Sequence, residues 1–108
     1  MKQGDPRAKK AFDPGDYPAL REFLPAYLHQ DFGEFYNSAA EAVKAFLAEA
    51  SGDEIYDVKR EWNIFRNSFA GSPLWEIQKA LGEFDCAWMP QSETELRAVD
   101  EILSGAQA

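Results

Sequence analysis

Few side chains in this sequence could act as a nucleophile, a base or a metal ligand. The chain has one histidine, His29, and one cysteine, Cys86, and neither lies in a motif that pairs a nucleophile with a base. His29 and Asp31 could act as two metal ligands, but zinc and iron sites need three or four, and Cys86 is the only other strong donor. His29 can instead interact with a helix dipole, and Asp31 can accept backbone N–H groups in a turn. The sequence therefore predicts no catalytic residue, no metal site, no cofactor and no enzymatic activity.

The sequence also lacks the patterns of phosphate, nucleic-acid and membrane binding. Its seven glycines are scattered singly, so there is no phosphate-binding loop. Basic residues interleaved with aromatic ones are absent from the part expected to fold, which argues against direct nucleic-acid binding. No window approaches the roughly 18 consecutive apolar residues of a membrane helix. The first residues lack the apolar run of a secretory signal, and a lone cysteine cannot form an internal disulfide, so we expect a cytoplasmic protein.

Negative charge is the most informative property of the chain. The sequence has 19 acidic and 11 basic residues, for a net charge of -8. Four of the bases lie in the first ten residues, so residues 11–108 carry 7 basic and 18 acidic groups, a net of -11. A domain this acidic repels nucleic acid and anionic membranes, and it attracts basic partners from a distance. The alternative is that the charge serves only to keep the protein soluble.

Acidic residues on the expected helices differ from those between them. Several helical acids have a base three or four residues later, as in ordinary surface ion pairs: Glu41 with Lys44, Asp57 with Arg60, Glu76 with Lys79, and Glu93 with Arg97. Others have no base within the following four residues: Asp13, Asp16, Asp31, Glu34, Glu83, Asp85, Asp100 and Glu101. Because recognition often takes place on loops, we expect acids of this second group to contact a basic partner. The candidate partner-binding acids are Asp31, Glu34, Glu83 and Asp85.

The loop at residues 83–91 mixes acids with large apolar side chains. It reads Glu-Phe-Asp-Cys-Ala-Trp-Met-Pro-Gln. Trp and Met are enriched in interface cores, where an aromatic anchor surrounded by charge is a common arrangement. Trp88 is therefore a fifth candidate contact. Alternatively, Trp88 and Phe84 pack the loop onto the helices.

Five predicted helices must position these residues. Residues 1–16 lack apolar periodicity and contain scattered Gly and Pro, so we expect a flexible tail followed by a single domain over residues 17–108. Capping-box patterns predict three of the helix starts, at Ser38–Glu41, Ser51–Glu54 and Ser92–Glu95. Ser72 is the expected N-cap of another helix, and Pro25 is expected to kink or divide the first one. The apolar spacings place the helices at about 19–30, 39–50, 52–69, 73–81 and 93–104. The expected fold is a compact all-α bundle.

Two segments of the chain carry a family resemblance. They run from Tyr17 to Phe32 and from Ser38 to Ser51, and their most specific part is Tyr27-Leu-His-Gln-Asp31-Phe32. With the residues through Gly82, they resemble contact-dependent growth inhibition immunity proteins of bacteria, the helical group called CdiI. The resemblance covers most of residues 17–90 and implies cytoplasmic binding to the C-terminal toxin domain of a CdiA-type effector. Such toxins are frequently nucleases, so the resemblance also implies a partner with a basic, nucleic-acid-binding cleft.

Two other classes of function fit parts of the sequence. An acidic helical adaptor or regulatory subunit could bind a basic host protein with no toxin involved. A small metal-dependent enzyme would use His29, Asp31 and Cys86. The charge pattern and the resemblance together favour an immunity protein that occupies a basic cleft in place of its substrate.

Overall fold

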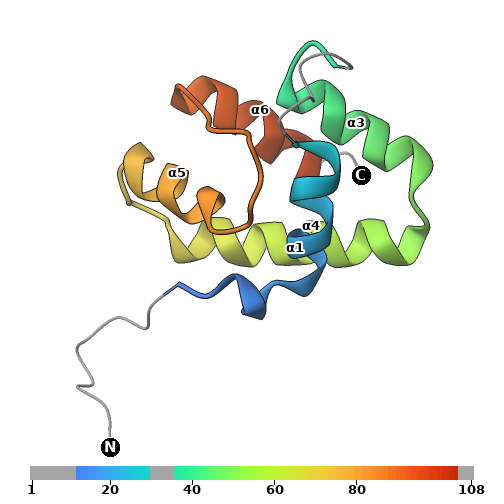
Figure 1. The fold of residues 1–108 in the computed structure, drawn as a ribbon, viewed down its shortest axis with the longest axis horizontal. Helices are drawn as coiled ribbons and strands as arrows, with labels where there is room; N and C mark the ends of the chain where they lie inside the picture. The colour runs from blue at the N-terminus through green and yellow to red at the C-terminus, as the bar shows by residue number, and fades with distance from the viewer. Residues whose placement is uncertain (1–11, 30–35, 105–108) are drawn as a thin grey trace, which may run out of the picture.

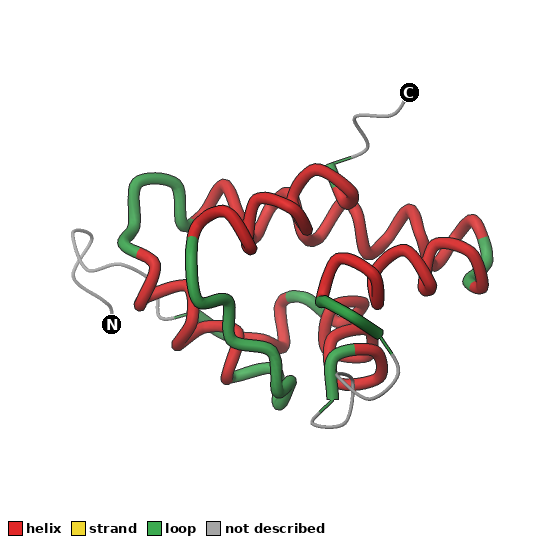
Figure 2. The backbone as a smooth tube through the Cα atoms, turned by 90° about the horizontal axis from the view of Figure 1, so that it is seen from above, coloured by secondary structure: helices red, strands yellow, loops and turns green. Residues whose placement is uncertain are grey.

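The described part of the molecule consists of helices and loops. The computed structural model describes residues 12–29 and 36–104. These residues form five α-helices and one short 3-10 helix and contain no strand (Figure 1 and Figure 2), so the all-α prediction is confirmed. The elements are η1 (Pro14–Asp16), α1 (Pro18–Tyr27), α3 (Ala39–Glu49), α4 (Gly52–Ser68), α5 (Leu74–Gly82) and α6 (Glu93–Leu103). Within these ranges, no helix combines the length and the apolar character needed to span a bilayer.

Serine side chains cap three of the helices, as the sequence predicts. Ser51 Oγ accepts the Glu54 N–H, and the Glu54 carboxylate accepts the Ser51 N–H, which completes a capping box at α4. Ser38 and Ser92 likewise accept the N–H three residues later at the starts of α3 and α6. The boxes predicted at Ser38 and Ser92 are incomplete among the described residues. The Glu41 carboxylate pairs with Lys44 at 3.6 Å, and the Glu95 carboxylate bonds elsewhere, as described below.

Prolines set two helix boundaries differently from the prediction. α1 runs without interruption through Pro25, although this residue has no N–H to donate within the helix, and it ends soon afterwards at Tyr27. The helix is therefore one piece and shorter than expected. At α5 the N-cap is Pro73, not Ser72, because Pro73 has an extended backbone with φ -69° and ψ 159° and the helix begins only at Leu74.

The core lies between α1, α3, α4 and α6. α1 crosses α4 and also packs against α3, while α6 packs against both α3 and α4 (Figure 1). The apolar stripe of α4 faces this core, where Val58, Trp62 and Phe65 are buried. α1 contributes Leu20, Phe23 and Leu24, and the apolar face of α6 contributes Leu96, Val99 and Leu103. Burial of this apolar surface is the main force that holds the helices together.

The folded part begins earlier than predicted. Phe12 packs against the core, with its ring centroid 5.5 Å from that of Phe84 and 5.7 Å from that of Phe65. η1 follows, capped by Asp13, whose carboxylate accepts the Gly15 N–H at 2.8 Å. Residues 12–16, which we expected to belong to the tail, are thus held by aromatic packing. Residues 1–11 lie outside the described part of the chain.

Candidate partner-binding surface

Three acidic residues from two segments line one hollow at the surface. Asp13 precedes η1, whereas Glu83 and Asp85 follow α5, and all three border a hollow of about 380 Å³. This η1–α5 hollow is lined by Asp13, Pro14, Gly15, Arg21, Pro25, Glu83, Phe84 and Asp85. The fold therefore brings together three of the acids that have no base within the following four residues. Asp31 and Glu34, the other two acids predicted to contact a partner, lie outside the described residues.

A tight turn holds the two acids that follow α5. Phe84 is 2% exposed and anchors the turn in the core. The N–H groups of Phe84 and Asp85 donate to the carbonyls of Leu81 and Gly82 at 3.0 and 3.1 Å. Asp85 has a left-handed backbone (φ 63°), which Asp tolerates better than most residues. Glu83 and Asp85 are both exposed, and neither carboxylate makes a hydrogen bond or ion pair with another described residue.

The hollow is negatively charged as a whole. The described partner of the Asp13 carboxylate is a backbone N–H, which brings no positive charge. Among the described residues that line the hollow, Arg21 is the single base, against the carboxylates of Asp13, Glu83 and Asp85. A surface of this kind attracts cations and basic protein segments.

Trp88 lies in the core. Its side chain is 3% exposed, and its Nε1–H donates to Glu95 Oε2 at 2.7 Å. Glu95 Oε1 accepts the Gln91 N–H at 3.0 Å, so this carboxylate ties down the loop and does not close the capping box of α6. The Ala87 N–H also donates to the Leu28 carbonyl, at 2.8 Å, which joins the loop to the end of α1. Of the two interpretations of Trp88, the structure supports packing of the loop onto the helices, and a direct contact with a partner would require the loop to open.

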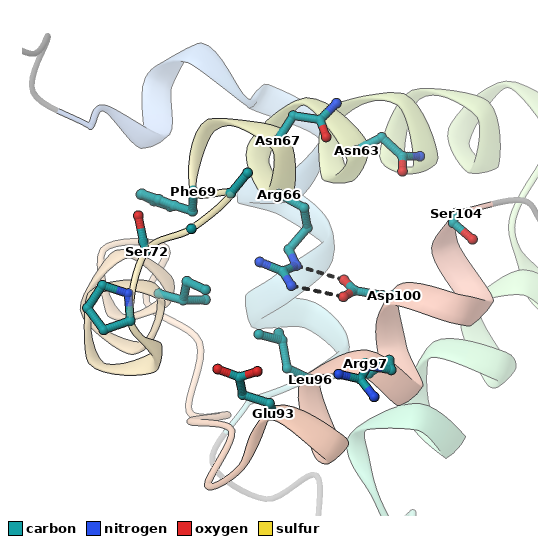
Figure 3. A pocket seen from close by; sticks show the side chains of 14 residues that line it. Asn63, Arg66, Asn67, Phe69, Ser72, Glu93, Leu96, Arg97, Asp100 and Ser104 are labelled. Carbon is teal, nitrogen blue, oxygen red and sulfur yellow. Dashed lines mark hydrogen bonds and ion pairs between the residues drawn. The ribbon is translucent and has the colours of Figure 1, made fainter.

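The expectation that Asp100 is unpaired is wrong. Its Oδ1 accepts a hydrogen bond from Arg66 Nε at 2.8 Å, and its Oδ2 accepts one from Arg66 Nη2 at 3.0 Å (Figure 3). Oδ1 also accepts one from Trp62 Nε1 at 2.9 Å. These partners are more than 30 residues away in the chain, so local spacing could not reveal them. The bidentate pair joins α4 to α6.

The groove around this ion pair is balanced in charge. It has a volume of about 640 Å³ and lies between the end of α4, the 70–73 turn and α6 (Figure 3). Arg66 and Arg97 line it together with Glu93 and Asp100, so positive and negative groups cancel. No His, Lys or Cys occurs among the described residues that line it. It offers neither a base beside a nucleophile nor a surface of one sign.

Cys86, the candidate nucleophile, lies in a setting that disfavours its thiolate form. Burial raises the pKa of the Cys86 thiol to about 11, so the thiol is protonated at neutral pH and is a poor nucleophile. Its Sγ lies near the carbonyl oxygens of Leu81 and Trp88, at 3.6 and 3.7 Å. Residues 12–29 and 36–104 contain no group of three or more His, Cys, Asp or Glu able to hold a metal ion. Asp31, the third member of the possible metal set, is outside those ranges.

Glu61 is a positioning residue that was not predicted. Its side chain is buried, and its Oε1 accepts the N–H groups of Ala19 and Leu20 at 2.9 and 3.0 Å, which caps the start of α1. A signal for this role exists in the sequence: Glu61 lies three residues after Val58 and directly before Trp62, on the apolar stripe of α4. A carboxylate at such a position needs buried hydrogen-bond donors.

The comparisons with known proteins identify the family. Residues 16–98 match the family model described as CdiI immunity protein. No curated protein and no solved structure matches the chain. The matched range covers well over half of the chain and includes α1, α3, α4, α5 and the turn that carries Glu83 and Asp85. The helical fold, the acidic surface and this match together show that the chain belongs to the CdiI immunity protein family.

Proposed function

We propose that this immunity protein neutralises its cognate toxin by placing the η1–α5 hollow against a basic, nucleic-acid-binding cleft of the toxin domain. Binding of a cognate toxin is the function that membership of the family implies. We further propose that the toxin is a nuclease, that the bound surface is its nucleic-acid-binding cleft, and that the complex forms in the cytoplasm. The single observation that carries it is the gathering of Asp13, Glu83 and Asp85 around one exposed hollow.

Charge supports this surface over the groove around Asp100. The carboxylates of Glu83 and Asp85 pair with no other described residue, whereas Asp100 is satisfied within the fold. Unpaired carboxylates keep their full field and can imitate the phosphates that a nuclease cleft binds. Folding has already fixed the turn that presents them, so little ordering entropy is lost when they bind.

Apolar contacts should supply much of the affinity. Met89 is 48% exposed in the 83–91 loop, and Trp75 is 60% exposed on α5. α5 and this loop are joined, because Gln78 Nε2 donates to the Pro90 carbonyl at 2.6 Å. Exposed Trp and Met side chains are typical of interface anchors. Trp88 contributes to the proposal by holding the loop in this position.

Coexpression with the toxin domain encoded beside this chain tests the proposal. We expect a stoichiometric complex on co-purification and protection of the cells. The double variant Glu83→Gln/Asp85→Asn removes both charges, and Asn retains the tolerance of Asp for the left-handed backbone at position 85. It should weaken binding at least tenfold.

The matched control is Asp53→Asn/Glu93→Gln. It removes the same charge from exposed positions in the first turns of α4 and α6, outside the hollow, and should bind nearly as well as wild type. Equal effects of the two double variants would contradict the assignment of the surface. A complete lack of binding by the wild-type chain would contradict the proposed function itself and favour the adaptor hypothesis.

A further inference from the structure

A second hollow lies on the other side of α1, between α1 and α4. Its volume is about 490 Å³. The floor is apolar: Phe23, Phe46 and Val58 line it and are nearly buried. Along α1, the small residues Ala19 and Ala26 also line it, and their short side chains leave the floor uncovered. We call this the α1–α4 groove.

The floor is rigid. The Phe23 and Phe46 ring centroids are 4.5 Å apart, and the Tyr27 ring packs 5.4 Å from that of Phe46. Tyr27 Oη donates to Glu49 Oε1 at 2.7 Å, which fixes α1 to α3 beside the groove. Glu61 holds the other end of α1. The groove is thus formed before any partner binds.

Carboxylates surround this apolar floor. Glu22, Glu54 and Asp57 are exposed, and they line the groove together with the buried Glu61. Arg60 is the single base among the described lining residues, and it is already engaged, 4.0 Å from Asp57 and 3.9 Å from Glu61. The Glu22 carboxylate makes no hydrogen bond or ion pair with another described residue. An apolar floor with an acidic rim is complementary to a segment that presents one apolar side chain between Lys or Arg residues.

We infer that the α1–α4 groove receives an amphipathic basic helix of the toxin domain. This inference rests on the proposed function and adds a second contact to it. α1 is the ridge between the two acidic hollows: Arg21 and Pro25 line one, and Glu22 and Ala26 line the other. A toxin seated over α1 reaches both. The hollow beside η1 contributes mainly charge, whereas the groove also has an apolar floor that can bury an anchor, as hot-spot contacts require.

The variant Ala26→Arg tests this inference. The long cationic side chain fills the groove and repels a basic partner. Ala98→Arg is the matched control, because Ala98 is also an exposed helical alanine and does not line the groove. We expect the Kd for the toxin domain, measured by calorimetry, to rise at least tenfold for Ala26→Arg and less than about twofold for Ala98→Arg. Equal Kd values for the two variants would overturn the inference while leaving toxin neutralisation intact.

A second pair of variants decides the outcome if Ala26→Arg disturbs the fold. Glu22→Gln removes one rim charge, and Glu93→Gln removes one charge outside the groove. Circular dichroism of the free proteins checks that both remain folded. Glu22→Gln should raise the Kd about threefold or more relative to Glu93→Gln, mainly through slower association. Indistinguishable values would reject the groove as a contact. Failure of the wild-type chain to bind the toxin would instead reject the proposed function.

Discussion

The buried carboxylate of Glu61 joins α4 to the start of α1, and its removal should strongly destabilise the fold. Glu61→Ala leaves the Leu20 N–H buried and the Ala19 N–H partly buried without their acceptor. Hydrogen bonds to charged groups contribute about 1.5 to 3 kcal/mol each, and a vacated site of this size admits some water. We expect a loss of about 3 kcal/mol in the free energy of unfolding. Glu61→Gln retains a side-chain oxygen and loses only the charge at the helix N-terminus, which should cost about 1 kcal/mol.

Urea unfolding followed by circular dichroism measures both values. Asp57→Ala is the control on the same helix: Asp57 is exposed, and its pair with Arg60 is a surface contact at 4.0 Å, so the loss should stay below about 0.5 kcal/mol. A Glu61→Ala variant no less stable than Asp57→Ala would refute the role of Glu61 in holding α1. Because α1 separates the two acidic hollows, Glu61→Ala should also weaken toxin binding, whereas Glu61→Gln should largely preserve it.

Three further predictions concern other parts of the fold. Asp100→Ala removes the acceptor of Arg66 and Trp62 and should cost about 2 to 3 kcal/mol in urea unfolding; a loss below about 0.5 kcal/mol would show that the bidentate pair contributes little. The pKa of Cys86 is raised from 9.0 to about 11, so iodoacetamide at pH 8 should alkylate the native chain roughly 100-fold more slowly than the urea-unfolded chain, and similar rates would contradict its protected setting. The hydrogen bond to Glu49 raises the pKa of Tyr27 from 10.0 to about 12, so Tyr27, like Cys86, binds its proton more tightly in the folded state. The stabilising contributions of both groups are complete below about pH 9, and the free energy of unfolding should fall between about pH 9 and 12. Urea unfolding at graded pH would show this fall, which should be less steep in Tyr27→Phe and Cys86→Ala.

Local patterns in the sequence predicted the helices well. The Ser51–Glu54 box and the apolar stripe through Val58, Trp62 and Phe65 depend on residues within one or two turns of each other. Such short-range chemistry is fully visible in a sequence. The same holds for the surface pair Asp57–Arg60, which forms as expected.

Long-range contacts account for the differences. Phe12 packs against Phe65 and Phe84 only because the fold brings them together, and nothing beside Phe12 in the sequence indicates a core residue. The Glu95 carboxylate accepts a hydrogen bond from Trp88 instead of closing the capping box of α6. The same contact holds the Trp88 indole inside the fold, although the composition of the loop suggested it as an interface anchor. Asp13 and Glu83 are likewise joined across the fold, so the hollow that they share could not be located from the sequence.

The salt dependence of toxin association tests most directly whether opposite charge brings the two proteins together. Stopped-flow mixing of this chain with its cognate toxin domain would give the association rate constant between about 0.02 and 0.5 M NaCl, a range over which the screening length shortens severalfold. We predict that the rate constant falls at least tenfold across this range, and that Glu83→Gln/Asp85→Asn reduces both the rate at low salt and the slope. A rate constant independent of salt, or an unchanged slope in the double variant, would contradict an acidic surface that recognises a basic cleft.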